Sequence, residues 1–139
     1  MSKIALMIKK IEHIGIAVKS LQNSNDLFKK LFGKDHYKVE SVESEGVSTS
    51  FFMIGETKIE LLEATQENSA IAKFIEKKGE GIHHLAFEVE DIYAEMERMR
   101  KEGFKLLNET PKNGADQKLV CFLNPKDTNG VLIELCQQI

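Results

Sequence analysis

The feature that most constrains the fold of this chain is an internal repeat, because two similar halves are expected to fold as two similar units. His13 opens the run HIGIAVKS, which ends at Ser20, and His84 opens the run HLAFEVED, which ends at Asp91. Both runs are apolar enough for a buried strand. Both end at a side-chain oxygen that can accept hydrogen bonds from the free N–H groups at the start of a helix. The chain therefore carries the same strand-then-helix signal twice.

Apolar residues recur at helical spacing after both caps. Each predicted helix presents one apolar face, and the two helices end at Gly33 and Gly103. The residues of these faces are Leu27, Phe28, Leu31 and Phe32 in the first helix and Ile92, Met96 and Met99 in the second. A third, short helix is predicted within 67–81. It has Ser69 as its cap and Ile71, Phe74 and Ile75 as its buried face.

Each half closes with the same apolar–Glu–apolar segment, Ile59-Glu60-Leu61 in the first half and Ile133-Glu134-Leu135 in the second. β-like runs come before these segments, and Gly-containing turns separate them. Each half therefore has the pattern of a βαβββ module. We expect one domain over 1–139, with module one at about 11–65, a linker helix at about 66–80 and module two at about 82–137.

A four-stranded sheet with one helix leaves one face of the sheet uncovered. Two such modules can cover each other by joining their sheets. We therefore expect an α+β fold, a curved and partly closed mixed β-sheet barrel with the helices outside. The alternative is an unrelated α+β sandwich in which the repeat is accidental.

Composition limits the partners. The 139 residues are 42% hydrophobic and 29% charged, as in a soluble globular domain. The net charge of −3 would recruit neither nucleic acid nor an anionic membrane, so neither is expected as a partner. The apolar run Ile4–Ile8 is shorter than a signal-peptide core, so we expect a cytoplasmic protein, with a processed organellar form as the alternative. Cys121 and Cys136 are too few for a disulfide framework and are interpreted as buried, small apolar residues.

The repeat places two histidines and two glutamates at equivalent positions: His13, Glu60, His84 and Glu134. Strand side chains alternate between faces, so each Glu points away from its branched apolar neighbours. A buried carboxylate is costly unless a nearby charge offsets it, and a divalent cation would do so. These four residues are the predicted metal ligands. They suit one transition-metal ion per chain, for which we expect Co²⁺, with Zn²⁺, Mn²⁺, Ni²⁺ or Fe²⁺ as alternatives.

Each of the four residues also has an ordinary structural interpretation. A single His at a strand start is usually held by structural hydrogen bonds, and a Glu on an edge strand usually faces solvent. The metal interpretation depends on finding all four at equivalent places in a repeat. His83, next to His84, is expected to face the other way, in a structural role or behind the ligands.

Several motifs resemble the glyoxalase and dioxygenase superfamily, namely EHIGIAV at 12–18, GIHHLAFEV at 81–89 and GVLIEL at 130–135. A narrower resemblance, to the methylmalonyl-CoA epimerase family, is carried by PKNGA at 111–115, FLNPK at 122–126 and the same GVLIEL segment. This resemblance covers nearly all of Ile11–Gln137.

The resemblance implies a divalent-metal-dependent epimerase that interconverts (2R)- and (2S)-methylmalonyl-CoA by removing and returning the C2 proton through a metal-bound enediolate. It also implies that His13, His84 and Glu134 bind metal, with Glu60 where members carry Gln or Glu. A preplaced cation would stabilise the negative charge that develops on the substrate oxygens. An acyl-CoA partner and a homodimer are what the family suggests.

Inversion at C2 needs a proton removed from one face and returned to the other, hence two groups or one mobile group. Glu134 is the first candidate, and Glu60 could act from the other side of the metal. Some members of the family carry a second carboxylate just after the Gly-Val that matches 46–47. Here Thr49, a poor base, stands at that position, and Glu45 is a nearby alternative.

Lys112 and Lys126 could bind the CoA phosphates or the substrate carboxylate as point charges, or be solvated loop lysines. Two other functions share the resembled fold. Glyoxalase I uses a His/Glu metal set to isomerise the glutathione hemithioacetal of methylglyoxal, and a metal-free drug-binding module would need no converging ligands. The NPKDTNGV loop at 124–131 favours the epimerase.

Overall fold

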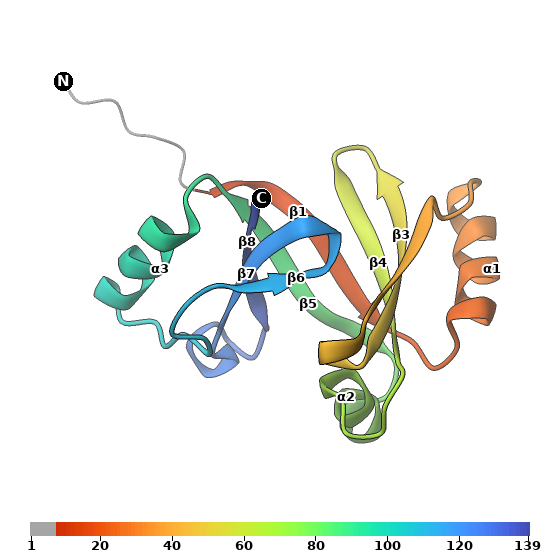
Figure 1. Ribbon diagram of the computed structural model, residues 1–139. Coiled ribbons are helices and arrows are strands. Elements are labelled where there is room, and N and C mark those ends of the chain that lie inside the picture. The colour runs from red at the N-terminus through yellow and green to blue at the C-terminus, as the bar shows by residue number, and fades with distance from the viewer. Residues whose placement is uncertain (1–7) are drawn as a thin grey trace. The chain divides into compact units, whose positions relative to one another are not determined.

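The computed structural model describes residues 8–139, so all of the apolar run Ile4–Ile8 except Ile8 lies outside the described residues. The chain forms β1 (Ile8–Ala17), α1 (Leu21–Phe32), β2 (Lys38–Val42), β3 (Val47–Ile54), β4 (Thr57–Ala64), α2 (Ala70–Lys78), β5 (Gly81–Val89), α3 (Ile92–Lys101), β6 (Lys112–Gly114), β7 (Lys118–Leu123) and β8 (Ile133–Gln138) (Figure 1). Short 3₁₀ turns, η1 (Glu43–Glu45), η2 (Ala115–Gln117) and η3 (Pro125–Asp127), lie between strands. The predicted order of strand, helix and three strands therefore occurs twice, with α2 between the repeats.

The described residues divide into two compact units, His13–His84 and Leu85–Ile139 together with the segment 8–12. The boundaries fall inside β1 and β5. In the first unit the strand order is β2-β3-β4-β1-β5, and in the second it is β1-β5-β8-β7-β6. The pairs β1–β4 and β5–β8 are parallel, whereas β2–β3, β3–β4, β6–β7 and β7–β8 are antiparallel. The expected α+β class with mixed β-sheet pairing is confirmed.

The helix caps lie where the sequence predicts them. The Ser20 Oγ accepts a hydrogen bond from the backbone N–H of Asn23 at 3.2 Å, and Gly33 ends α1 in a left-handed conformation with φ of 74°. Ser69 caps α2 through the N–H of Ala72. Asp91 caps α3 through two backbone N–H groups. These local bonds satisfy free N–H groups in the first turn of each helix and so mark where the helix begins.

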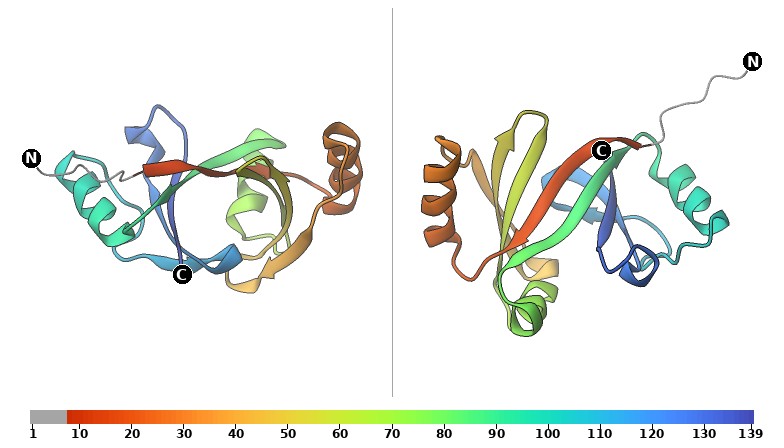
Figure 2. Two further views of the ribbon diagram at one scale, coloured as in Figure 1. Left: turned by 90° about the horizontal axis from the view of Figure 1, so that it is seen from above. Right: turned by 180° about the vertical axis from the view of Figure 1, so that it is seen from behind.

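The predicted apolar face of α1 is half wrong. Phe28 and Phe32 pack on the ring of Phe52, with ring centroids 6.4 Å and 5.4 Å apart. Leu27 and Leu31 instead remain 61% and 68% exposed. The helix lies alongside β3 and β4 (Figure 2), and this contact covers a single stripe of residues spaced four apart. Leu27 and Leu31 form the neighbouring stripe, which faces away from the strands.

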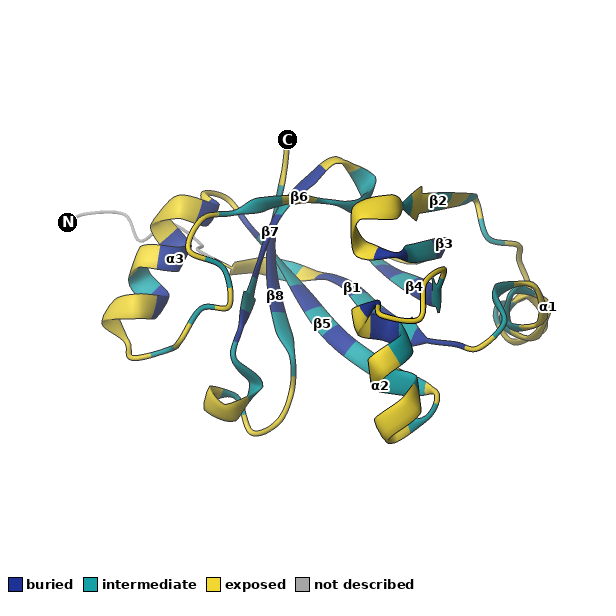
Figure 3. Cartoon of the chain, turned by 60° about the horizontal axis from the view of Figure 1, so that its bottom comes forward, coloured by how far each residue is buried: buried dark blue, intermediate teal, exposed yellow. Residues whose placement is uncertain are grey.

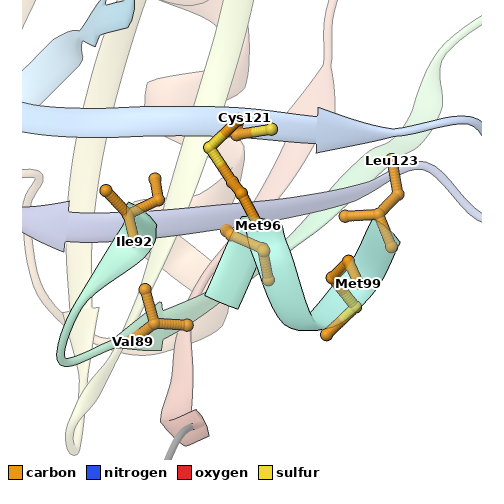
Figure 4. Close-up of a cluster of buried hydrophobic side chains, with 7 residues drawn as sticks. Val89, Ile92, Met96, Met99, Cys121 and Leu123 are labelled. Atoms are coloured by element: carbon orange, nitrogen blue, oxygen red, sulfur yellow. The ribbon is translucent and has the colours of Figure 1, made fainter. Parts of the chain in front are cut away.

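The face of α3 is buried as predicted. Its core cluster consists of Val89, Ile92, Met96, Met99, Cys121, Leu123 and Leu135, most of which are labelled in Figure 4. On α2, Ile71 packs with Ala17 and Leu62 as expected. Burial is concentrated on the strands, and α1 and α3 carry many exposed residues (Figure 3). Among residues 8–139, no helix is long and apolar enough to cross a membrane.

A buried ion pair lies between β1 and β7. Glu12 and Lys118 are only 3% and 4% exposed, and the Lys118 Nζ is 3.9 Å from the Glu12 carboxylate. The same ammonium group donates to the side-chain oxygen of Gln138. Two charges removed from water in this way depend on each other, because loss of either one leaves the other buried with less compensation for its charge.

Substituting Lys118→Met is expected to lower the free energy of unfolding by about 3 kcal/mol, because it removes the Lys118 cation from beside the buried Glu12 carboxylate. Adding Glu12→Gln to Lys118→Met should recover part of that loss. Urea denaturation followed by circular dichroism measures both. The control is the exposed pair Lys9–Glu88, with side chains 47% and 20% exposed and 3.6 Å apart. Lys9→Met should cost under about 1 kcal/mol. Equal losses at Lys118 and Lys9 would contradict the buried pair.

Both cysteines are buried as predicted, and their thiols are free. Burial raises the pKa of the Cys136 thiol, and the carboxylates of Glu134 and Glu12 raise it further. Burial also raises the pKa of the Cys121 thiol. Since the thiolate is the reactive form, both groups should be chemically inert in the folded protein.

The native protein is therefore expected to show almost no reaction with Ellman's reagent at pH 8 or pH 9. Both thiols should react after unfolding in urea. A raised pKa keeps the thiol protonated as the pH rises, so the native protein should react no faster at pH 9 than at pH 8. Rapid labelling of either cysteine in native buffer would show that its surroundings open to solvent.

Candidate metal centre

Two buried histidine rings contact each other in the first compact unit. His13 on β1 and His84 on β5 are 5% and 6% exposed. Their Nε2 atoms are 3.0 Å apart, and the rings lie edge to face with centroids 5.0 Å apart. The predicted convergence of these two side chains is therefore seen directly.

Gly15 makes room for the His84 ring. A Cβ atom at Gly15 would lie 2.2 Å from the Cε1 atom of His84, well inside the contact limit. A glycine within a strand often marks such a close approach. Any side chain at this position would displace the imidazole, so the HIG motif at 13–15 supplies both a histidine and the space for its partner.

Glu60 lies beside His13. The β1–β4 register pairs Gly15 with Glu60, which is 5% exposed. The Glu60 Oε2 is 3.2 Å from the His13 Nδ1. An ionised carboxylate only accepts hydrogen bonds, so the proton of a neutral His13 ring belongs on Nδ1 and its Nε2 carries the lone pair.

The chemistry of these groups fits a transition-metal ion. The His13 Nε2 lone pair is directed toward the His84 Nε2, and two ligands at right angles on a metal with bonds of about 2.1 Å lie about 3 Å apart. The observed 3.0 Å separation matches this spacing. Imidazole nitrogens with a buried carboxylate also suit such ions by ligand type. His13 and His84 therefore have the separation and the setting of two ligands of one ion.

Glu134 lies on β8 in the other compact unit and is 5% exposed. Its register partners are Ala86 on β5 and Phe122 on β7. Ala86 follows His84 by two residues, as Gly15 follows His13 by two. Each half thus pairs its Glu with the residue two positions beyond its His. The repeat found in the sequence is therefore also a repeat of strand register.

The two lysines predicted to bind CoA differ in setting. Lys112 begins β6, and its Nζ lies over the ring of Phe122, 5.7 Å from the centroid. Since Phe122 is also the register partner of Glu134, Lys112 and Glu134 lie on the same face of the second unit. Lys126 is exposed on the η3 turn, where its backbone N–H donates to the Asn124 side-chain oxygen at 3.0 Å.

Thr49 is 1% exposed on β3 and pairs with Leu62, so its side chain shares the face of Glu60. Glu45 is exposed on the η1 turn. Across from Thr49 on β2 lies Glu40, whose carboxylate is 3.6 Å from the Lys38 ammonium group. Position 49 therefore carries no carboxylate base. The carboxylate opposite it is that of Glu40 on the neighbouring strand β2.

Sequence reasoning missed some buried polar residues. Lys58 is the register partner of His13 and is only 8% exposed. Lys118 alternates with Val120 and Phe122 on β7, which was the available signal that it faces inward. His83 contacts His84, with their Nδ1 atoms 2.9 Å apart, although strand alternation predicts opposite directions.

The chain is similar to a superfamily and to individual enzymes. Residues 12–122 match the sequence profile of the Glyoxalase/Bleomycin resistance protein/Dioxygenase superfamily. The ethylmalonyl-CoA/methylmalonyl-CoA epimerase of Cereibacter sphaeroides is 41% identical, over 94% of this chain and 99% of its own length.

Two solved structures have the same fold. Methylmalonyl-CoA epimerase from Mycobacterium tuberculosis superposes with a TM-score of 0.92 at 31% identity, covering 99% of this chain and 93% of the other. A variant of the Streptomyces coelicolor enzyme, in complex with 2-nitronate-propionyl-CoA, gives 0.90 at 34% identity, covering 94% and 98%. The predicted fold and the predicted resemblance are both confirmed. The chain belongs to the methylmalonyl-CoA epimerase family, within the Glyoxalase/Bleomycin resistance protein/Dioxygenase superfamily.

Proposed function

We propose that this protein interconverts (2R)- and (2S)-methylmalonyl-CoA by removing and returning the proton at C2. The observation that carries the proposal is the pair of buried Nε2 atoms of His13 and His84, 3.0 Å apart, in a chain similar to epimerases over nearly its whole length. Burying two imidazoles and a carboxylate side by side costs folding free energy, and apolar residues would fill the same space at lower cost. A purely structural role would therefore favour apolar residues here.

His13, Glu60, His84 and Glu134 are the proposed ligands of one divalent ion. The first three lie in one unit, and the shared register is the argument for adding Glu134. When bound, the ion would act as a Lewis acid that stabilises the negative charge formed on the substrate oxygens. Imidazole and carboxylate ligands suit Co²⁺, Zn²⁺, Mn²⁺, Ni²⁺ and Fe²⁺, and Co²⁺ is our first proposal.

The proton transfers are assigned to carboxylates. Glu134 removes the proton from C2 on one face, and Glu60 is the proposed partner for the other face. Both are buried, so both act in a setting from which bulk water is largely absent. Thr49 is unsuited to this work, because an alkyl hydroxyl is too weak a base near neutral pH.

Lys112 is the proposed contact for an anionic oxygen of the substrate, since its ammonium group shares a face with Glu134. Lys126 is proposed as a second, more exposed contact for a CoA phosphate. A homodimer in the cytoplasm is the proposed state of the protein.

The decisive measurement is exchange of the C2 proton of methylmalonyl-CoA in D₂O, followed by NMR for each epimer separately, with and without Co²⁺. Glu134→Gln should slow epimerisation by about 100-fold or more, because general acid–base groups contribute factors of this size. Exchange that persists from one epimer without inversion would show that one of two bases survives. No exchange by the native protein with any divalent ion would refute the proposed reaction.

Glu60→Gln tests the second face. It keeps an oxygen ligand and removes the base, so exchange should be lost mainly from the other epimer. Metal content measured on each variant separates loss of a base from loss of the ion. The matched control is Glu67→Gln, at an exposed position, which should retain full activity. If Glu60→Gln exchanges both epimers normally, the second role passes to another group, and Glu40 is the carboxylate beside Thr49.

Lys112→Met is expected to raise the KM for methylmalonyl-CoA by about 10-fold or more, the effect of losing one hydrogen bond to a charged group. The increase in KM should be smaller at higher salt, because screening also weakens the contact that Lys112 makes in the unsubstituted protein. Steady-state kinetics at two ionic strengths measures this. Lys126→Met serves as the comparison and should have the smaller effect. Equal effects of the two substitutions would contradict the placement of Lys112 at the substrate.

A further inference from the structure

His83 is a polar residue at the histidine pair to which neither the repeat nor the proposed reaction gives a role. It precedes His84 on β5, and its Nδ1 lies 2.9 Å from the Nδ1 of His84. The two rings are nearly perpendicular, at 89°. The His83 ring also lies nearly perpendicular to the ring of Phe74 on α2, with centroids 4.9 Å apart. The ring is therefore held from two directions, by an aromatic side chain and by the neighbouring imidazole.

The contact between the two Nδ1 atoms contains one proton. Each neutral imidazole has one N–H group and one lone pair, so a hydrogen bond between two Nδ1 atoms needs the proton on one ring and the lone pair on the other. If the proton is on His84, the Nε2 of His84 carries a lone pair. If the proton is on His83, the Nε2 of His84 carries hydrogen and cannot bind a metal ion.

The opposite nitrogen of His84 decides between these arrangements when an ion is bound. The Nε2 of His84 faces the Nε2 of His13, whose own lone pair is fixed by Glu60 behind it. Two lone pairs at this distance repel each other unless a cation lies between them. A ligand pair therefore needs both Nδ1 atoms protonated and both held by an acceptor. Glu60 is that acceptor for His13.

We propose that His83 is the corresponding acceptor for His84, a positioning residue that holds the metal-binding tautomer of His84. This inference rests on the metal centre of the proposed function. Partners behind a metal-bound histidine fix its tautomer and orientation, and their loss typically weakens metal binding by about 10- to 100-fold. Phe74 acts one step further out, because its contact keeps the His83 ring turned toward His84.

The test compares His83→Phe with His83→Asn. Phenylalanine keeps a ring against Phe74 but offers no acceptor, whereas the Asn side-chain oxygen can take the place of the Nδ1 lone pair. Affinity for Zn²⁺ and Co²⁺ is measured by competition with a chromophoric chelator, and circular dichroism checks folding. His83→Phe should bind about 10- to 100-fold more weakly, and His83→Asn should recover most of that loss.

A second readout uses the unsubstituted protein. In the zinc-loaded form, ¹⁵N NMR of the histidine rings should find hydrogen on the Nδ1 of His84 and none on the Nδ1 of His83. Hydrogen on the Nδ1 of His83, or Zn²⁺ affinity of His83→Phe within about twofold of the native value, would overturn this inference and leave the proposed function standing. Failure of the native protein to bind any of these ions would overturn both.

Discussion

The register of two parallel strand pairs is the constraint on which the candidate site depends. In β1–β4 and in β5–β8, a glutamate lies beside the residue two positions after a histidine. Side chains alternate along a strand, so a slip of one residue in β4 would turn Glu60 into the apolar layer under α1 and Leu61 onto the opposite face. Leu61 is fully buried where it lies. Taking Leu61 out of this packing would cost up to about 2 kcal/mol, and placing the Glu60 carboxylate in the apolar layer would cost more. The layers under α1 and α3 therefore hold the carboxylates in place.

Buried charge is the second constraint, and the molecule meets it in two ways. Glu12 is neutralised inside the protein by Lys118, 3.9 Å away. The Glu60 carboxylate lies 3.2 Å from the Nδ1 atom of the His13 ring. An imidazole proton satisfies one oxygen of a carboxylate but does not cancel its charge at neutral pH. The first arrangement is an ion pair between two side chains, and the second places a carboxylate beside an imidazole, which are ligand types that suit a bound transition-metal ion.

Much of the fold could be predicted because its signals are local. The caps at Ser20, Ser69 and Asp91 depend on residues within one turn of the helix, and alternation places Glu60 and Glu134 from their immediate neighbours. What could not be predicted depends on contacts between distant segments.

Leu27 and Leu31 have the right spacing for burial, yet the strands beside α1 cover only the stripe of Phe28 and Phe32. The partner of Lys118 lies more than a hundred residues earlier in the chain. His83 is a different case, because simple alternation separates adjacent side chains, whereas two long rings at right angles can still meet around the strand.

Position 49 on β3 carries a buried threonine and no carboxylate, so the two equivalent glutamates of the repeat are the candidate bases. With Thr49 on the face of Glu60, that strand supplies no base, and the repeat itself supplies one carboxylate from each half. Charge counting favours the same pair. Two carboxylates and one divalent cation sum to zero, so an anionic acyl-CoA would meet no net negative charge among the proposed ligands. A glutamine in place of Glu60 would leave one positive charge and hold an anionic substrate more tightly before reaction. Binding the ground state more tightly does not by itself speed the chemical step. A glutamate at this position therefore gives up electrostatic attraction and offers a second proton acceptor in return.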